Sequence, residues 1–338
     1  MHLPGQPFPA VALVRRAHAV HAMLPMHRRV TLAVGLAAST CLALGAPSCR
    51  RAEPVRTNAP ARAVDRSPSI VVAADDLAAR LATVLVLDVR GATEYARAHV
   101  AGAVHLPVSE TFDANDGRRD RLAPHDAIRR ALSRAGVDRR EPVVVYDDGA
   151  LRDAARVFWV IELCGHESVA VLDGGFVQWR AKGLPVATTA SISARSDFAA
   201  TFDARRFALE SDVLAALRDD SGVVVDVRTQ DEFVGFTPSF GRAGHVAGAR
   251  HLDSASLVER RGGLLRLASP DGLARATADL PPARRAIVYA NTGADAALAF
   301  LALRVLGREV ALYDGAWKEW AADPRRPIET GFDLAAPR

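Results

Sequence analysis

The stretch AIVYANTGADAALAF (residues 286–300) places polar side chains where an α/β protein could carry out chemistry. Its pattern predicts a buried strand, a short loop with a glycine, and an apolar helix. The end of such a strand and the start of the next helix meet in a loop that commonly holds the active site. This loop contains no Cys, Ser, His or Lys, so it lacks an obvious nucleophile. Its residues are Ala290, Asn291, Thr292, Gly293, Ala294 and Asp295.

The elements around this loop occur twice in the chain. VLVLDVRGATEYARAHVAGAVHLP (84–107) returns within residues 223–253, where VGFTPSFG (234–241) forms part of an insertion. The segment 143–179 returns as 286–320. A repeat period of about 140 residues indicates a duplicated domain and not a solenoid.

Within each copy, short β-branched runs alternate with helical patterns, for example 143–146 followed by 154–163. This alternation predicts an α/β protein of two domains, each a parallel sheet with helices on both faces. We expect the domains to span residues 69–190 and 197–332. Residues 50–68, rich in Pro, Ala and Arg, are typical of a flexible tether.

The N-terminus is typical of an export signal. A basic start, MHRR, precedes the uncharged apolar run 30–46, and the whole segment 1–49 resembles a lipoprotein signal with Cys49 as the lipidated residue. An ordinary cleaved signal or an uncleaved anchor is the alternative. We expect an exported protein of the cell envelope or periplasm, lipid-anchored at Cys49, whose start codon is Met1, Met23 or Met26.

The charge of the chain argues against a nucleic-acid partner. Residues 1–48 hold four Arg and no acidic residue, so the rest carries 43 − 4 = 39 basic and 39 acidic residues. No basic stripe with interleaved aromatic residues remains. We therefore expect no nucleic-acid partner, and contact with a membrane only through the N-terminal anchor.

Both copies carry D-x-R-x-x-x-E after a predicted strand and a histidine a few residues later. An arginine–carboxylate pair can fix how strand, turn and helix meet, and we expect the Arg to pair with the Glu as a structural brace. Each histidine is expected to brace a backbone carbonyl, because no second metal ligand stands at useful spacing. We expect no metal and no cofactor. The structural residues are Asp88, Arg90, Glu94 and His99 in the first copy, and Asp226, Arg228, Glu232 and His245 in the second.

These motifs, together with V-Y before the loop, L-D-G-G, and Y-D-G-x-W-x-E-W, resemble the tandem-domain rhodanese family over residues 70–330. The resemblance implies a thiosulfate or 3-mercaptopyruvate sulfurtransferase, in which a loop cysteine takes sulfur from an anionic donor as a persulfide. That cysteine directly follows V-Y in the second domain, where this chain has Ala290. Dual-specificity phosphatases that share the fold need the same cysteine.

The first copy does not supply the missing group. Asp147 follows Tyr146, as in the inactive first domain usual in the family, and the predicted loop comprises Asp147, Asp148, Gly149 and Arg152. Cys164 ends an apolar helix, where burial would raise its pKa and leave it a small hydrophobe. Asp295 is expected to repel an anionic donor.

Three functions remain open from the sequence. The favoured one is an exported, catalytically inactive rhodanese-family protein that binds a small anion or an envelope protein partner. The alternative is an active sulfurtransferase that passes sulfur from thiosulfate or 3-mercaptopyruvate to a thiol or cyanide. A third is different chemistry with Asp147 or Asp295 as a general base, for which neither residue has a visible partner.

Overall fold

The computed structural model describes residues 69–114, 120–219, 221–281 and 284–331. The predicted export segment, the tether, Cys49 and the three alternative start residues lie outside these ranges. Within the described ranges, no helix combines the length and the apolar character that a membrane crossing needs.

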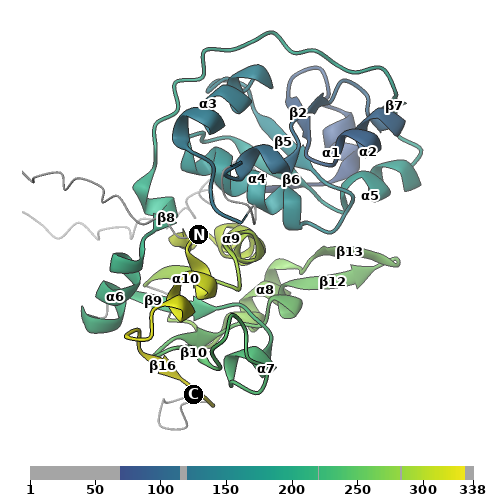
Figure 1. Cartoon of the computed structure of the whole chain (residues 1–338). Helices are drawn as coiled ribbons and strands as arrows, with labels where there is room; N and C mark the ends of the chain where they lie inside the picture. Colours follow the sequence, from purple (N-terminus) through teal and green to yellow (C-terminus); the bar gives the residue numbers. More distant parts are fainter. Residues whose placement is uncertain (1–68, 115–119, 220, 282–283, 332–338) are drawn as a thin grey trace, which may run out of the picture. The chain divides into compact units, whose positions relative to one another are not determined.

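The first domain is built on a five-stranded parallel sheet in the order β1-β6-β5-β2-β4 (Figure 1). The strands are β1 (Val71–Val72), β2 (Leu85–Asp88), β4 (Val104–His105), β5 (Val143–Tyr146) and β6 (Val169–Leu172). Its helices are α1 (Ala74–Ala78), α2 (Ala92–Arg97), α3 (His125–Arg134), α4 (Arg152–Leu163) and α5 (Gly175–Ala181). A small antiparallel pair joins β3 (His99–Val100) to β7 (Val186–Ala187).

The second domain repeats this arrangement with the sheet order β11-β9-β14-β15-β8, again all parallel. The strands are β8 (Phe207–Ala208), β9 (Gly222–Asp226), β11 (Arg250–His251), β14 (Arg285–Tyr289) and β15 (Val310–Tyr313). Its helices are α6 (Glu210–Asp219), α7 (Gln230–Phe233), α8 (Pro270–Ala276), α9 (Gly293–Val305) and α10 (Ala316–Ala322). Two antiparallel pairs complete it: β10 (His245–Val246) with β16 (Ile328–Glu329), and the hairpin of β12 (Val258–Arg261) and β13 (Leu264–Leu267).

Alternate residues of the central strands enter different cores, because successive side chains of a strand point to opposite faces. In β5, Val143 and Val145 pack with α3 and α4, whereas Val144 and Tyr146 pack with α1 and α5. The second sheet is divided in the same way between α8 and α9 on one face and α6 and α10 on the other. The predicted parallel sheets with helices on both faces are therefore confirmed.

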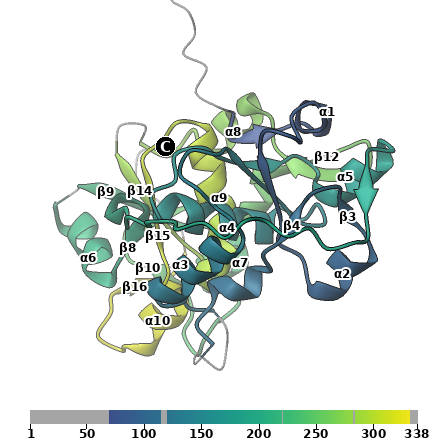
Figure 2. The same cartoon turned by 90° about the horizontal axis from the view of Figure 1, so that it is seen from above.

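One continuous core includes residues of both domains. It joins them through α4 and α9, the helices that follow β5 and β14, which lie side by side (Figures 1 and 2). The rings of Phe158 and Phe300 meet there with their centroids 6.4 Å apart. Because both helices are almost entirely buried, their sequences are apolar around most of their circumference.

Candidate functional site

The loop after β14 is held tightly against α10. The backbone N–H of Trp317 donates to the carbonyl of Ala290 at 2.9 Å, and that of Lys318 donates to the carbonyl of Asn291 at 3.3 Å. A Cβ on Gly293 would lie 2.3 Å from Oδ1 of Asp314, so only glycine allows this approach. The loop is thus a fixed turn at the carboxyl edge of the sheet, where the sequence predicts it.

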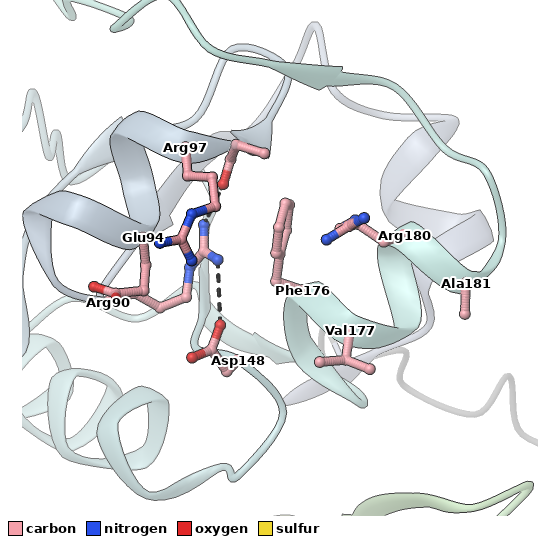
Figure 3. A pocket seen from close by; sticks show the side chains of 9 residues that line it. Arg90, Glu94, Arg97, Asp148, Phe176, Val177, Arg180 and Ala181 are labelled. Atoms are coloured by element: carbon pink, nitrogen blue, oxygen red, sulfur yellow. Dashed lines mark hydrogen bonds and ion pairs between the residues drawn. The ribbon is translucent and has the colours of Figure 1, made fainter.

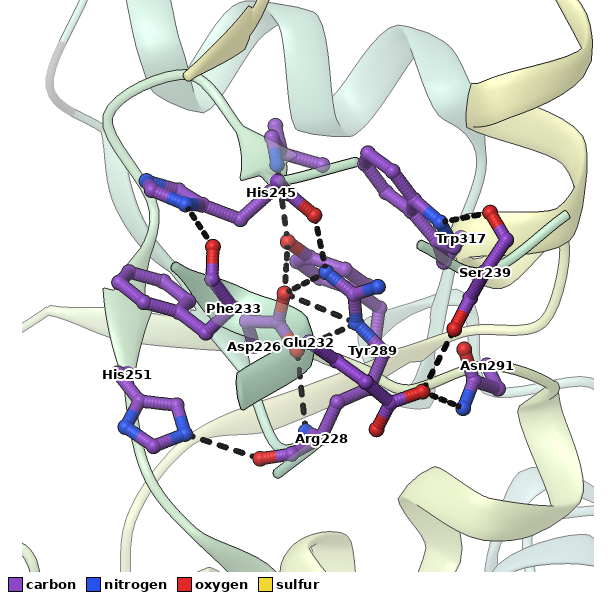
Figure 4. Close-up of polar contacts among 12 residues, drawn as sticks. Asp226, Arg228, Glu232, Phe233, Ser239, His245, His251, Tyr289, Asn291 and Trp317 are labelled. Carbon is purple, nitrogen blue, oxygen red and sulfur yellow. Dashed lines mark hydrogen bonds and ion pairs between the residues drawn. The ribbon is translucent and has the colours of Figure 1, made fainter. Parts of the chain in front are cut away.

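A buried polar network lies beneath the loop (Figure 4). Arg228 donates to Asp226 through Nε at 3.0 Å and through Nη2 at 2.6 Å. The Tyr289 hydroxyl donates to Asp226 Oδ2 at 2.7 Å and accepts the backbone N–H of Val246 at 3.0 Å. Burial opposes a charged guanidinium, but the hydrogen bond to Asp226 and the negative charge around it together raise the pKa of Arg228, so this ion pair stays charged.

The first copy has the same network, with Arg90 on Asp88 and the Tyr146 hydroxyl on Asp88 at 2.6 Å. The prediction that each arginine pairs with the glutamate four residues later is therefore wrong. The aspartate at the end of the strand lies in the same turn as the arginine two residues later. Its two oxygens can therefore accept hydrogen bonds from the guanidinium group without a contribution from the glutamate. Glu94 lies instead beside Gly91 at the start of α2.

Glu232 is a structural residue, as predicted, but its partners differ from the predicted Arg228. It completes a capping box with Thr229 at the start of α7 and accepts hydrogen bonds from Ser239 Oγ at 2.7 Å and Asn291 Nδ2 at 2.6 Å. Partial burial alone would raise the pKa of Glu232, but these bonds together hold it below the usual range. Its ionised carboxylate ties α7, the insertion and the loop together (Figure 4).

The two predicted histidine braces are confirmed. Nδ1 of His99 lies 2.8 Å from the carbonyl oxygen of Tyr95, and Nδ1 of His245 lies 2.7 Å from that of Phe233. Burial lowers the pKa of His245, so its ring is neutral at pH 7. In the described ranges, no group of three or more His, Cys, Asp or Glu side chains is arranged as a metal site.

A pocket of about 250 Å³ opens at the loop and is lined by Ala290, Asn291, Asp295, Arg228 and Arg152 among others. The Ala290 side chain is a buried methyl, 2% exposed. Two buried polar atoms, Nη1 of Arg228 and Oδ1 of Asn291, have no hydrogen-bond partner among the described residues. Arg228 lines the pocket, and the N-terminus of α9 lies beside it, where the helix dipole favours an anion.

Asp295 does not carry a free negative charge into this pocket. Its carboxylate forms an ion pair with Arg152 of the first domain and accepts the Thr292 hydroxyl at 2.9 Å. The structure therefore brings together two residues that the sequence places in separate loops. This pairing offsets the predicted repulsion of an anionic donor and leaves Asp295 poorly placed as a general base.

In the first-domain loop, Asp147 occupies the position that corresponds to Ala290. It is buried, and its carboxylate accepts the backbone N–H of Gly149 at 2.7 Å and of Ala154 at 3.3 Å. Burial raises the pKa of Asp147 despite these bonds. The Asp147 carboxylate thus accepts hydrogen bonds from the backbone N–H groups of its own loop. This arrangement argues against a free general base at this position.

Cys164 is the only cysteine in the described ranges, and it is fully buried at the end of α4. Burial raises the pKa of its thiol to about 12, so almost none is thiolate at neutral pH. Cys164 is not among the lining residues of the loop pocket. The prediction that it is a small hydrophobe is confirmed.

The sequence did not reveal the charged residues that join the domains. Arg156, buried in α4, donates to Asp314 at 2.9 Å, and Arg266 of β13 donates to Asp173 at 2.8 Å. Asp173 and Asp314 are equivalent residues of the two D-G turns, so each turn receives an arginine from the other domain. One available signal was an arginine inside the apolar helix RDAARVFWVIEL.

Comparison with known proteins gives a consistent result. A family model described as "Rhodanese-like domain" matches residues 73–182 and 210–323. The chain is 34% identical to the thiosulfate sulfurtransferase of Corynebacterium glutamicum, over 78% of this chain and 91% of the relative. It is 31% identical to the 3-mercaptopyruvate sulfurtransferase of Escherichia coli, over 70% and 85%. The crystal structure of SseA from Escherichia coli, a 3-mercaptopyruvate sulfotransferase, matches with a TM-score of 0.64 and 27% identity, over 74% of this chain and 99% of SseA.

Proposed function

Because the chain belongs to the rhodanese family, we propose that it is a member that binds a small anion at the loop after β14 without transferring sulfur. The observation that carries this proposal is the buried methyl of Ala290 at the position before the N-terminus of α9. A thiolate is needed to attack a sulfur donor and hold the persulfide, and an alanine provides neither.

The anion-binding part rests on the surroundings of that methyl. Nη1 of Arg228 is an unused buried donor, and α9 contributes the positive end of its dipole. The anion would be a small oxyanion, or the acidic side chain of an envelope protein that inserts into the pocket.

The names of the relatives favour the alternative, an active thiosulfate or 3-mercaptopyruvate sulfurtransferase. For the described part of the chain, that activity would need sulfur on Cys164, whose thiol is buried and has a pKa of about 12. The binding role accounts for the loop better.

The test is a thiosulfate:cyanide sulfur-transfer assay on the full chain, Ala290→Cys and Ala290→Ser. We expect no turnover from the parent or the Ser variant, and a rate at least about a hundredfold above background from the Cys variant. Ser matches Cys in size but is a poor nucleophile, so it controls for side-chain bulk. Turnover by the parent protein would refute the inactive assignment.

Anion binding is tested separately by titrating sulfate into the parent and Ala290→Asp, with tryptophan fluorescence or NMR as the readout. The new carboxylate would take the loop donors, as Asp147 does in the first domain, so sulfate binding should be lost. Equal sulfate affinity in both proteins would place the anion elsewhere.

The proposed location is the cell envelope, with a lipid anchor at Cys49. It rests on the basic start and apolar run of residues 26–46. Cells grown with radioactive palmitate should label the full chain but not Cys49→Ala. An unlabelled parent protein would leave only a cleaved signal or an uncleaved anchor.

A further inference from the structure

A second pocket lies in the first domain between α2 and α5, apart from the loop after β14. It has a volume of about 590 Å³, which is within the usual range for small-molecule sites. Three of its lining residues are arginines: Arg90, Arg97 and Arg180. Figure 3 shows Arg97 and Arg180 on opposite sides of Phe176.

The three arginines differ in how far they are already paired. The guanidinium group of Arg90 already donates hydrogen bonds to both Asp88 oxygens, to the carbonyl of Ala98 and to the Asp148 carboxylate. Arg97 and Arg180 are exposed and make no hydrogen bond or ion pair with any other described residue. Of the lining carboxylates, Asp148 lies 3.2 Å from Arg90, and Glu94 lies in the first turn of α2. Arg97 and Arg180 are therefore the lining cations that remain available to the acid group of a ligand.

The floor of the pocket is apolar. The Phe176 ring is 5% exposed and lies beneath Arg90, with the guanidinium carbon 4.0 Å from the ring centroid. Beside it, Val177 is 46% exposed, which is unusual for a large apolar side chain in this domain. Two unpaired guanidinium groups next to the exposed Val177 side chain favour a ligand with an acid group and an apolar part.

The second domain shows how this position can be filled. Trp317 and Glu232 are the equivalents of Phe176 and Glu94, and the inserted segment 234–241 covers them. The Trp317 indole donates to the carbonyl of Ser239 at 3.0 Å, while Ser239 Oγ donates to Glu232 at 2.7 Å (Figure 4). The first copy has no such insertion. The insertion therefore fills this position in the second domain, whereas the same position in the first domain is open to solvent.

We propose that the pocket between α2 and α5 binds an organic anion, a carboxylate or sulfonate on a short apolar body. The acid group contacts Arg97 and Arg180, and the apolar body lies on Val177 beside the edge of Phe176. This site is distinct from the anion site of the proposed function, because it shares no lining residue with the loop pocket. The ligand is either a free small molecule or an acidic side chain of an extended peptide.

The experiment titrates benzoate into the full chain by calorimetry or NMR, beside benzamide, a neutral molecule of the same shape. We expect benzoate to bind and benzamide not to bind. Arg97→Gln and Arg180→Gln should each weaken benzoate about two- to fivefold, as expected for exposed charge pairs, and added salt should weaken it further.

Arg218→Gln is the matched control, because Arg218 is also an exposed arginine in the last turn of a helix. It should leave benzoate affinity unchanged, as should Ala290→Asp, which addresses the loop pocket alone. Equal binding of benzamide, or equal loss in Arg218→Gln, would overturn the proposal. An acetylated Phe-Glu dipeptide amide that binds more tightly than benzoate would identify a peptide as the source of the acid group.

Discussion

The two domains share one fold but leave opposite positions open. In the first domain the loop donors are taken by Asp147, while the pocket between α2 and α5 is open. In the second domain the loop pocket is open at Ala290, while the insertion covers the position between α7 and α10. After duplication, a fold can thus keep its sheets and networks and divide its binding positions between the two copies.

What the domains share is the part that supports the fold. Each has an arginine bound to the strand-end aspartate and a tyrosine that donates to the same carboxylate. Each domain's D-G turn also receives an arginine from the other domain. Their differences lie in the side chains at the pockets, in the insertion 234–241 and in the hairpin of β12 and β13.

The largest stability effect should come from breaking the buried join between the domains. Arg156→Ala leaves the Asp314 carboxylate buried without its charged partner, and the free energy of unfolding should fall by about 3–5 kcal/mol. Urea unfolding measures this loss. The control is Arg152→Ala, because Arg152 pairs with Asp295 across the same two domains but is 62% exposed. Its cost should stay below about 1 kcal/mol. Similar losses in the two variants would mean that burial does not distinguish these ion pairs.

A smaller effect should distinguish the two loops by their pH dependence. Burial raises the pKa of Asp147 in the folded protein above its unfolded value. The stability that this group contributes is present at low pH, below the unfolded pKa, and is lost as the pH rises through the folded pKa. Ala290 has no such group.

Asp147→Asn should therefore gain stability relative to the parent protein as the pH rises above about 4, the usual pKa of an aspartate in an unfolded chain. Urea unfolding at several pH values measures the difference. A variant whose pH dependence runs parallel to that of the parent would show that Asp147 titrates normally. Ala290→Ser is the control, since it adds no ionisable group.

The sequence predicted the parallel sheets, the fixed loop, the histidine braces and the buried Cys164, because the strands and helices that produce them have clear local patterns and occur twice in the chain. It assigned Arg90 and Arg228 to the wrong carboxylates, since spacing alone does not give the direction of a side chain in a tight turn. The pair of Arg152 and Asp295 and the pair of Arg156 and Asp314 join residues far apart in sequence. Such pairs carry no periodic signal, so only the folded chain reveals them.

The packing of α4 against α9 has a consequence for the history of the chain. These are equivalent helices of two copies, and each buries its apolar face against the other. Equivalent surfaces that meet in this way are the signature of a two-fold homodimer. Here both surfaces belong to one polypeptide, so a residue of α4 can change without the same change in α9.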